Sequence, residues 1–243
     1  LIDPLKKAKI KHIIFDGVTA EPSVESVTEA VSFAKRGKFD LIIGFGGGAC
    51  LDTAKATSIM LTNPGKVSDY LARLPNPFED KIKKKGIPFI LIPTTAGTGS
   101  ENTAGSVIIE GKHKTWIASY YLYPNLSIVD PLLTVSLPPK VTAGCAMDAL
   151  SHAVEGFMVA ALANPWSDAF ALKATELISK SLRRVYHFGE NLEARWNMSW
   201  AATIAGWVAQ YTWGPATLGH CVAEALGSEY HIPHGVILSL IHI

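Results

Sequence analysis

The feature that most constrains the fold is a run of three glycines between an apolar segment and a helical one. Residues 40–45 form a short β-branched run, Gly46-Gly47-Gly48 follows, and residues 50–56 have a helical pattern. Glycines let a backbone approach a ligand closely, and the free N–H groups at a helix start favour a diphosphate. The segment predicts a strand, a phosphate-binding turn and a helix, and a tight turn without a ligand is the alternative.

Other short apolar runs indicate that this strand belongs to a sheet. The strand candidates are residues 11–15, 40–45, 88–92, 106–109, 115–118 and 126–129. Between the first two, residues 22–36 repeat apolar side chains at spacings of three and four, which is a helical period. Alternation of strand, helix and strand predicts an α/β domain with a parallel sheet and helices on its faces.

The pattern changes after Asp130-Pro131. Long Ala-rich and Leu-rich helical stretches follow, and they are broken near Asn164-Pro165, 187–189, Gly214-Pro215 and 230–233. We therefore predict two domains, an α/β domain over residues 1–137 and an all-helical domain over residues 138–243. Both ends of the chain read as interrupted elements, so we expect a fragment.

Composition and charge exclude several classes of protein. The formal net charge is +1 and the basic residues are scattered, so no face for nucleic acid is expected. The 3 cysteines lie far apart, which supports neither a disulfide framework nor a thiolate zinc site and fits a reducing cytoplasm. No apolar stretch reaches the roughly 20 residues that a membrane span needs. We expect a soluble cytoplasmic protein without nucleic-acid or membrane partners.

A second loop concentrates hydroxyl groups beside glycines. Residues 93–101, Pro-Thr-Thr-Ala-Gly-Thr-Gly-Ser-Glu, follow a predicted strand. Such a loop can hydrogen-bond a nucleotide, and it equally suits a polar turn and helix cap. The residues alone leave both interpretations open.

The helical half contains a set of metal-ligand side chains. Asp148 and His152 are four residues apart, so both project from one face of a helix. His220 and His234 follow, the second within Pro233-His234-Gly235. Three imidazoles and a carboxylate suit a divalent metal such as Fe(II) or Zn(II). Each histidine by itself is more often structural, so this set is a hypothesis.

Five blocks of the sequence resemble iron-containing, group III alcohol dehydrogenases. They are residues 15–22, 44–55, 93–101, 147–156 and 230–235, and they occur in the family's order. The resemblance implies a dehydroquinate synthase-like fold, in which a dinucleotide-binding domain and a helical metal-binding domain enclose the active site. It also implies NAD- or NADP-linked oxidation of a small alcohol to its aldehyde or ketone, a catalytic Fe(II) or Zn(II), and a homodimer.

The resemblance assigns roles to individual residues. The cofactor contacts that it implies are Gly47, Gly48, Asp52, Thr94, Thr95, Thr98 and Lys114. The metal ligands that it implies, catalytic through the metal, are Asp148, His152, His220 and His234. Glu224 stands where the family usually has the second histidine of HxxxH. We count it as a candidate catalytic residue that adjusts the metal's charge or relays a proton, with a plain surface ion pair as the alternative.

The comparison with the family pattern also leaves alternatives. The first strand and the last helices of the family are expected to lie outside this chain, so the choice between NAD and NADP is not readable. Residues 238–243 depart from the pattern and look foreign, so His242 is not counted as a ligand. The alternatives are a glycerol dehydrogenase, a maleylacetate reductase, a hydroxyacid-oxoacid transhydrogenase, or an inactive nucleotide-binding fragment. The intact ligand set argues against the metal-independent reductase.

Overall fold

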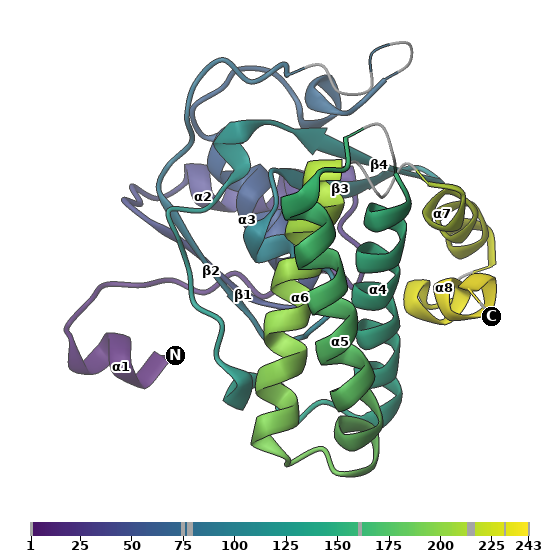
Figure 1. Ribbon diagram of the computed structural model, residues 1–243. Coiled ribbons are helices and arrows are strands. Elements are labelled where there is room, and N and C mark those ends of the chain that lie inside the picture. The colour runs from purple at the N-terminus through teal and green to yellow at the C-terminus, as the bar shows by residue number, and fades with distance from the viewer. Residues whose placement is uncertain are drawn as a thin grey trace.

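The computed structural model describes residues 2–73, 76, 80–159, 162–212, 217–230 and 232–242 (Figure 1). The first half contains the helices α1 (Ile2–Lys7), α2 (Val24–Lys35) and α3 (Gly48–Met60). Its strands are β1 (Ile42–Gly46), β2 (Phe89–Pro93), β3 (Gly105–Glu110), β4 (His113–Ala118) and β5 (Leu126–Ser127), and its short 3-10 helices are η1 (Val67–Tyr70), η2 (Ser100–Asn102), η3 (Tyr120–Leu122) and η4 (Pro131–Thr134). The second half contains α4 (Pro139–Met158), α5 (Pro165–His187), α6 (Leu192–Thr212), α7 (Leu218–Tyr230) and α8 (His234–His242).

The predicted parallel sheet is confirmed. Its strands lie in the order β1-β2-β5, and both pairs are parallel. In the β1–β2 ladder Gly46 is opposite Pro93, so the two strands end side by side. The glycine turn and the second loop therefore start from the same edge of the sheet, and the N–H of Thr94 donates to the carbonyl of Gly46 at 2.9 Å. Carboxyl ends of parallel strands are the usual position of a nucleotide site in such folds.

Two other predicted strands form a separate hairpin. β3 and β4 pair antiparallel in a two-stranded sheet of their own. The short connection explains this difference, since antiparallel strands need only a tight turn whereas parallel strands need a crossover. Gly111 takes the left-handed conformation in this turn, with φ of +63°. The hairpin carries Lys114 on β4.

The strand predicted over residues 11–15 is wrong, because that segment contains no strand. Ile13 is 66% exposed and Ile14 is 60% exposed. β-branched residues favour a strand only where a neighbouring strand accepts the ladder and a core covers one face. Among the described residues, this segment has neither.

Most helices were predicted from their periodicity. The segment 22–36 contains α2, which begins after a capping box between Ser23 and Ser26 and buries Val27 and Val31. In the second half, α5 begins with Pro165 after its N-cap Asn164, as the sequence indicated. The predicted break at Gly214-Pro215 lies outside the described residues. In the described part of the chain, no helix has both the length and the apolar character that a membrane crossing requires.

The second loop lies between the two halves of the molecule. In Figure 1, α4, α5 and α6 stand together, α7 and α8 lie beside α4, and the strands lie behind this bundle. The helical core is built largely from alanines of α4, α5 and α6, and it includes Ala96 of the second loop. Gly99, with φ of +61°, lies so close to α6 that an added Cβ would be 2.7 Å from the Cα of Gly206. The loop is therefore anchored on the helices while its strand belongs to the sheet.

Candidate metal and dinucleotide site

A cleft of about 620 Å³ opens at the edge where β1 and β2 end, and the helical half forms its opposite wall. Six of the seven predicted cofactor contacts line it, namely Gly47, Gly48, Asp52, Thr95, Thr98 and Lys114. All four predicted metal ligands and Glu224 line it as well. Thr94 is the predicted contact that the lining does not include, and its N–H holds the two strand ends together.

The glycine turn forms one wall of the cleft. Gly47 is the N-cap of α3 and Gly48 is its first residue, so the free N–H groups and the positive end of the helix dipole lie at the cleft. An added Cβ on Gly48 would lie 2.7 Å from Cγ2 of Thr98, whereas one on Gly47 would lie 3.5 Å from Cγ2 of Thr95. Gly48 is therefore needed for contact between the two loops, and Gly47 leaves open space that a ligand can enter.

Asp52 lies in a buried polar network. Its Oδ1 accepts a hydrogen bond from Ser100 at 2.6 Å, and its Oδ2 accepts one from the N–H of Val107 at 3.1 Å. The fully buried Lys55 donates to Ser100 at 2.9 Å, and it also donates to Thr103 and to the carbonyl of Gly105. Burial lowers the pKa of Lys55 to about 8, although the Asp52 carboxylate opposes this shift. Both oxygens of Asp52 therefore already have protein partners.

Three of the predicted metal ligands, all histidines, lie around the fourth, Asp148. Asp148 and His152 come from α4, His220 from α7, and His234 begins α8. The Oδ1 atom of Asp148 lies 3.8 Å from the Nε2 atom of each of the three histidines. Ligand atoms that each lie about 2.0–2.2 Å from one ion are separated by roughly 3–4 Å. Asp148, His152 and His220 thus have the mutual spacing of a metal site, with ligand atoms that all lie within 4.8 Å of one another, and His234 approaches the same oxygen of Asp148.

Two of these ligand atoms also lack other partners. Oδ1 of Asp148 and Nε2 of His220 are buried, and neither has a hydrogen-bond partner among the described residues. A buried carboxylate oxygen without a donor is costly and rare in native proteins. A divalent ion between these atoms would satisfy both, so the residues fit the metal that the sequence predicted.

The electrostatics of the site suit a cation. Burial lowers the pKa of His152 to about 4, and burial together with Lys114 lowers the pKa of His234 to about 3, so both rings are neutral at pH 7. Although burial acts to raise it, the three imidazoles hold the pKa of Asp148 below its usual range. Burial also acts to lower the pKa of His220, but Asp148 and Glu155 raise it to about 9.

These pKa values predict that metal binding releases a proton. Without metal, His220 is protonated at pH 7 because its pKa is about 9, and its Nε2 must lose that proton before it can coordinate. We expect release of about one proton per ion at pH 7, and an apparent affinity that increases with pH until about pH 9. Calorimetric titration in buffers of different ionisation enthalpy measures this number. Binding without proton release would contradict the assigned charge of His220.

Glu155 is a member of the site that the sequence reasoning missed. Its Oε2 lies 2.9 Å from Nδ1 of His220 and accepts the backbone N–H of the same residue at 3.3 Å. Its Oε1 lies 2.8 Å from Nε2 of His242. Glu155 follows Asp148 by seven residues, which places both on one face of α4. That spacing was the available signal. His242, which was not counted as a ligand, contacts Glu155.

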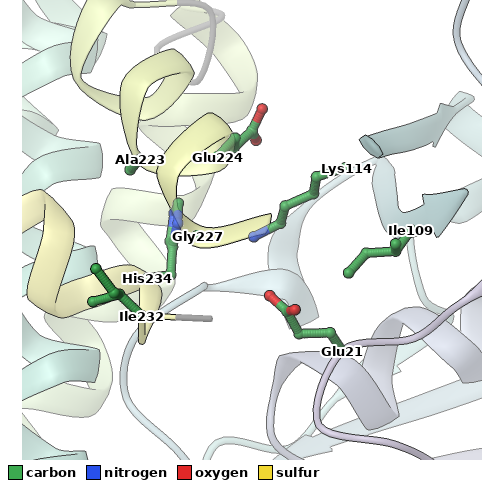
Figure 2. Close-up of a pocket in the computed structure, with 8 residues that line it drawn as sticks. All are labelled: Glu21, Ile109, Lys114, Ala223, Glu224, Gly227, Ile232 and His234. Carbon is green, nitrogen blue, oxygen red and sulfur yellow. The ribbon is translucent and has the colours of Figure 1, made fainter. Parts of the chain in front are cut away.

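Lys114 and Glu224 both line a small side pocket of the cleft. Glu21, Lys114, Glu224 and His234 are among its lining residues. Figure 2 shows the amino end of Lys114 reaching from β4 towards His234 and Glu21, with Glu224 on the neighbouring turn of α7. Burial raises the pKa of Glu224, and Lys114 opposes that shift. The carboxylate group of Glu224 is not part of the described ligand cluster Asp148, His152 and His220.

Two family models match this chain. Residues 1–131 match the family model described as iron-containing alcohol dehydrogenase. Residues 142–242 match the model described as Fe-containing alcohol dehydrogenase family, C-terminal, so residues 238–242, which look foreign in the sequence, lie within this match. The two models together cover nearly the whole chain.

Individual relatives show the same likeness. The chain is 43% identical over 232 residues to long-chain-alcohol dehydrogenase 1 of Geobacillus thermodenitrificans, covering 96% of this chain and 57% of that protein. It superposes on a crystal structure of 1,3-propanediol oxidoreductase with a TM-score of 0.91 and 34% identity, covering 99% of this chain and 61% of the other.

A third relative is a sulfoacetaldehyde reductase from Bifidobacterium kashiwanohense, solved in complex with NAD+. The match has a TM-score of 0.86 and 31% identity, and it covers 98% of this chain and 64% of that one. The chain thus spans about three-fifths of the length of the relatives that it matches. With two family models and these relatives in agreement, the chain belongs to the iron-containing alcohol dehydrogenase family.

Proposed function

We propose that the full-length protein is a metal-dependent alcohol dehydrogenase that uses NAD or NADP to interconvert a small alcohol and its aldehyde or ketone. The observation that carries the proposal is the position of Asp148 Oδ1, 3.8 Å from three imidazole nitrogens, in the same cleft as the glycine turn. An ion site and a diphosphate cradle in one cleft fit hydride transfer better than either feature does alone.

In this proposal the first half of the chain binds the dinucleotide and the second half binds the metal. Gly47 and Gly48 offer backbone N–H groups to the diphosphate, while Thr95 and Thr98 offer hydroxyls and Lys114 offers a cation. Asp52 accepts a hydrogen bond from Ser100 in the second loop, and the N–H of Thr94 donates to Gly46 in the glycine turn, so both residues hold these loops in place. When bound, the ion would supply Lewis-acid chemistry and the dinucleotide would serve as the hydride acceptor.

The metal site in this proposal is formed by four side chains. Asp148, His152, His220 and His234 would hold the ion at the wall of the cleft. Glu224 lies at the edge of the cleft, one helical turn from His220, as the candidate that moves a proton or contacts the substrate.

The finer assignments belong to the proposal as well. We propose Fe(II) as the metal, with Zn(II) as the alternative, because nitrogen and carboxylate ligands suit both. We also propose a homodimer, a cytoplasmic location, and a domain boundary between residues 137 and 138. The boundary is supported by the start of α4 at Pro139.

Transfer of an isotope tests the proposed reaction. We expect a primary alcohol with deuterium on its carbinol carbon to pass deuterium directly to NAD+ or NADP+ when the full-length protein is supplied with Fe(II) or Zn(II). Mass spectrometry of the reduced dinucleotide measures this transfer. No transfer to either dinucleotide from a panel of small alcohols would contradict the proposed function.

Gly47→Ala tests the diphosphate cradle. The protein has room for the added Cβ, which would be 3.5 Å from Thr95, but this atom would occupy the space that the diphosphate needs. We expect the Kd for the preferred dinucleotide to rise about tenfold, equivalent to about 1.4 kcal/mol. Fluorescence titration of the reduced dinucleotide measures it, with unchanged metal content as the control. Gly48→Ala is a poorer test because its Cβ would collide with Thr98. An unchanged Kd would show that Gly47 does not lie against the bound dinucleotide.

A further inference from the structure

Two of the imidazoles near Asp148, those of His220 and His152, differ in how their second ring nitrogen is held. Nδ1 of His220 lies 2.9 Å from Oε2 of Glu155, whose side chain is almost fully buried. Nδ1 of His152 is buried and has no hydrogen-bond partner among the described residues. Of these two histidines, His220 is the one whose orientation the surrounding protein controls through a carboxylate.

We propose that Glu155 is a positioning residue of the metal site, which holds His220 with its proton on Nδ1 and its Nε2 directed at the ion. This inference rests on the metal-dependent function proposed above. A neutral imidazole has one N–H, and an ionised carboxylate only accepts hydrogen bonds. When the metal is bound, the proton therefore stays on the nitrogen that faces Glu155, and the lone pair of Nε2 faces Asp148.

The same carboxylate also fixes the backbone of the ligand. Oε2 of Glu155 accepts the N–H of His220, which lies in the first turn of α7, where N–H groups have no partner within the helix. One oxygen atom thus holds both the ring and the main chain of His220. This double contact sets the position of α7 relative to Asp148 and His152 on α4, the helix that carries Glu155.

Gly219 provides an independent way to disturb this contact. An added Cβ on Gly219 would overlap Oε1 of Glu155 and lie 2.9 Å from its Cδ. Gly219 is the second residue of α7, where alanine is compatible with the helix and is favoured over glycine by less than the roughly 1 kcal/mol of a helix interior. Because a flexible carboxylate can move away and a backbone cannot, Gly219→Ala should displace Glu155 without breaking the helix.

The test is the affinity of the full-length protein for Zn(II), measured with chelator-buffered metal for the wild type, Glu155→Gln and Gly219→Ala. We expect each variant to bind Zn(II) about 10- to 100-fold more weakly. The Co(II)-loaded variants should also show visible absorption bands shifted from those of the wild type. His242→Ala is the matched control, because it removes the contact with the other carboxylate oxygen, and its affinity should stay within about threefold of wild type.

Thermal unfolding of the metal-free proteins separates positioning from general stability. The inference predicts that metal-free Gly219→Ala melts at or above the wild-type temperature while its Zn(II) affinity falls. Wild-type affinity in both Glu155→Gln and Gly219→Ala would overturn the inference and leave the proposed function standing. An equal loss in His242→Ala would also overturn it. A wild type that takes up no metal would overturn the proposed function and this inference together.

Discussion

Replacing His220 by alanine should reduce the metal content of the purified full-length protein to near background. The Nε2 of His220 is buried, lies 3.8 Å from Oδ1 of Asp148, and has no other partner among the described residues. Structural zinc sites with four ligands gain about 10–16 kcal/mol from the ion, so one ligand accounts for about 3 or 4 kcal/mol. Affinity should therefore fall by more than about 100-fold.

Elemental analysis of His220→Ala, beside wild type and an exposed control, measures this effect. His113→Ala is the control, because this histidine is on β4 with an exposed side chain. Alcohol oxidation should disappear in His220→Ala and persist in His113→Ala. Full metal content with full activity in His220→Ala would refute the assignment of the site.

Gly235→Ala should have the largest effect on folding stability. The helices α4 and α8 approach so closely that a Cβ on Gly235 would be 2.6 Å from the carbonyl carbon of Gly144 and 2.9 Å from its Cα. Because the atoms that the added Cβ would meet belong to the backbone of Gly144, they cannot rotate away as a side chain can, and α8 must shift. We expect a loss of about 1–3 kcal/mol in the free energy of unfolding. Because His234 precedes Gly235, the shift should also weaken metal binding.

Gly144→Ala is the matched control for Gly235→Ala. A Cβ on Gly144 would meet no heavy atom within 4 Å, and this residue lies inside α4. Alanine there should raise stability by up to about 1 kcal/mol through helix propensity. Urea unfolding of the metal-free proteins should thus give changes of opposite sign for two glycines at one contact. If Gly235→Ala is as stable as wild type, α4 and α8 do not pack as closely in solution as the contact between Gly235 and Gly144 requires.

Local patterns were enough to predict much of the fold. Residues 42–60 follow directly from an apolar run, three glycines and a helical period, and they form β1, the turn and α3. The errors concern which strands pair with one another. Residues 11–15 have strand-forming side chains but no neighbouring strand in the described chain, and residues 105–118 form an antiparallel hairpin instead of joining the parallel sheet.

The metal site was predictable in part. Asp148 and His152 lie on one helix, so their four-residue spacing alone predicts that they are close together. His220 and His234 lie on two other helices, and their assignment to the same site rests on the family resemblance. Glu155 was missed because its role depends on a partner 65 residues away. Lys55 was missed for a similar reason, since its partner Ser100 is 45 residues away. A side chain that holds a distant residue is hard to recognise from its own segment, although the seven-residue spacing from Asp148 does place Glu155 on the same face of α4.

The central claim is that the residues around Asp148 hold one ion that the reaction requires. The most direct measurement is alcohol-dependent formation of reduced dinucleotide by the full-length protein, after removal of metal and during stepwise addition of Fe(II) or Zn(II). The account predicts no activity without metal, and a linear rise that stops at about one ion per chain. Activity that persists after complete removal of metal, or that does not change when metal is added back, would contradict the account.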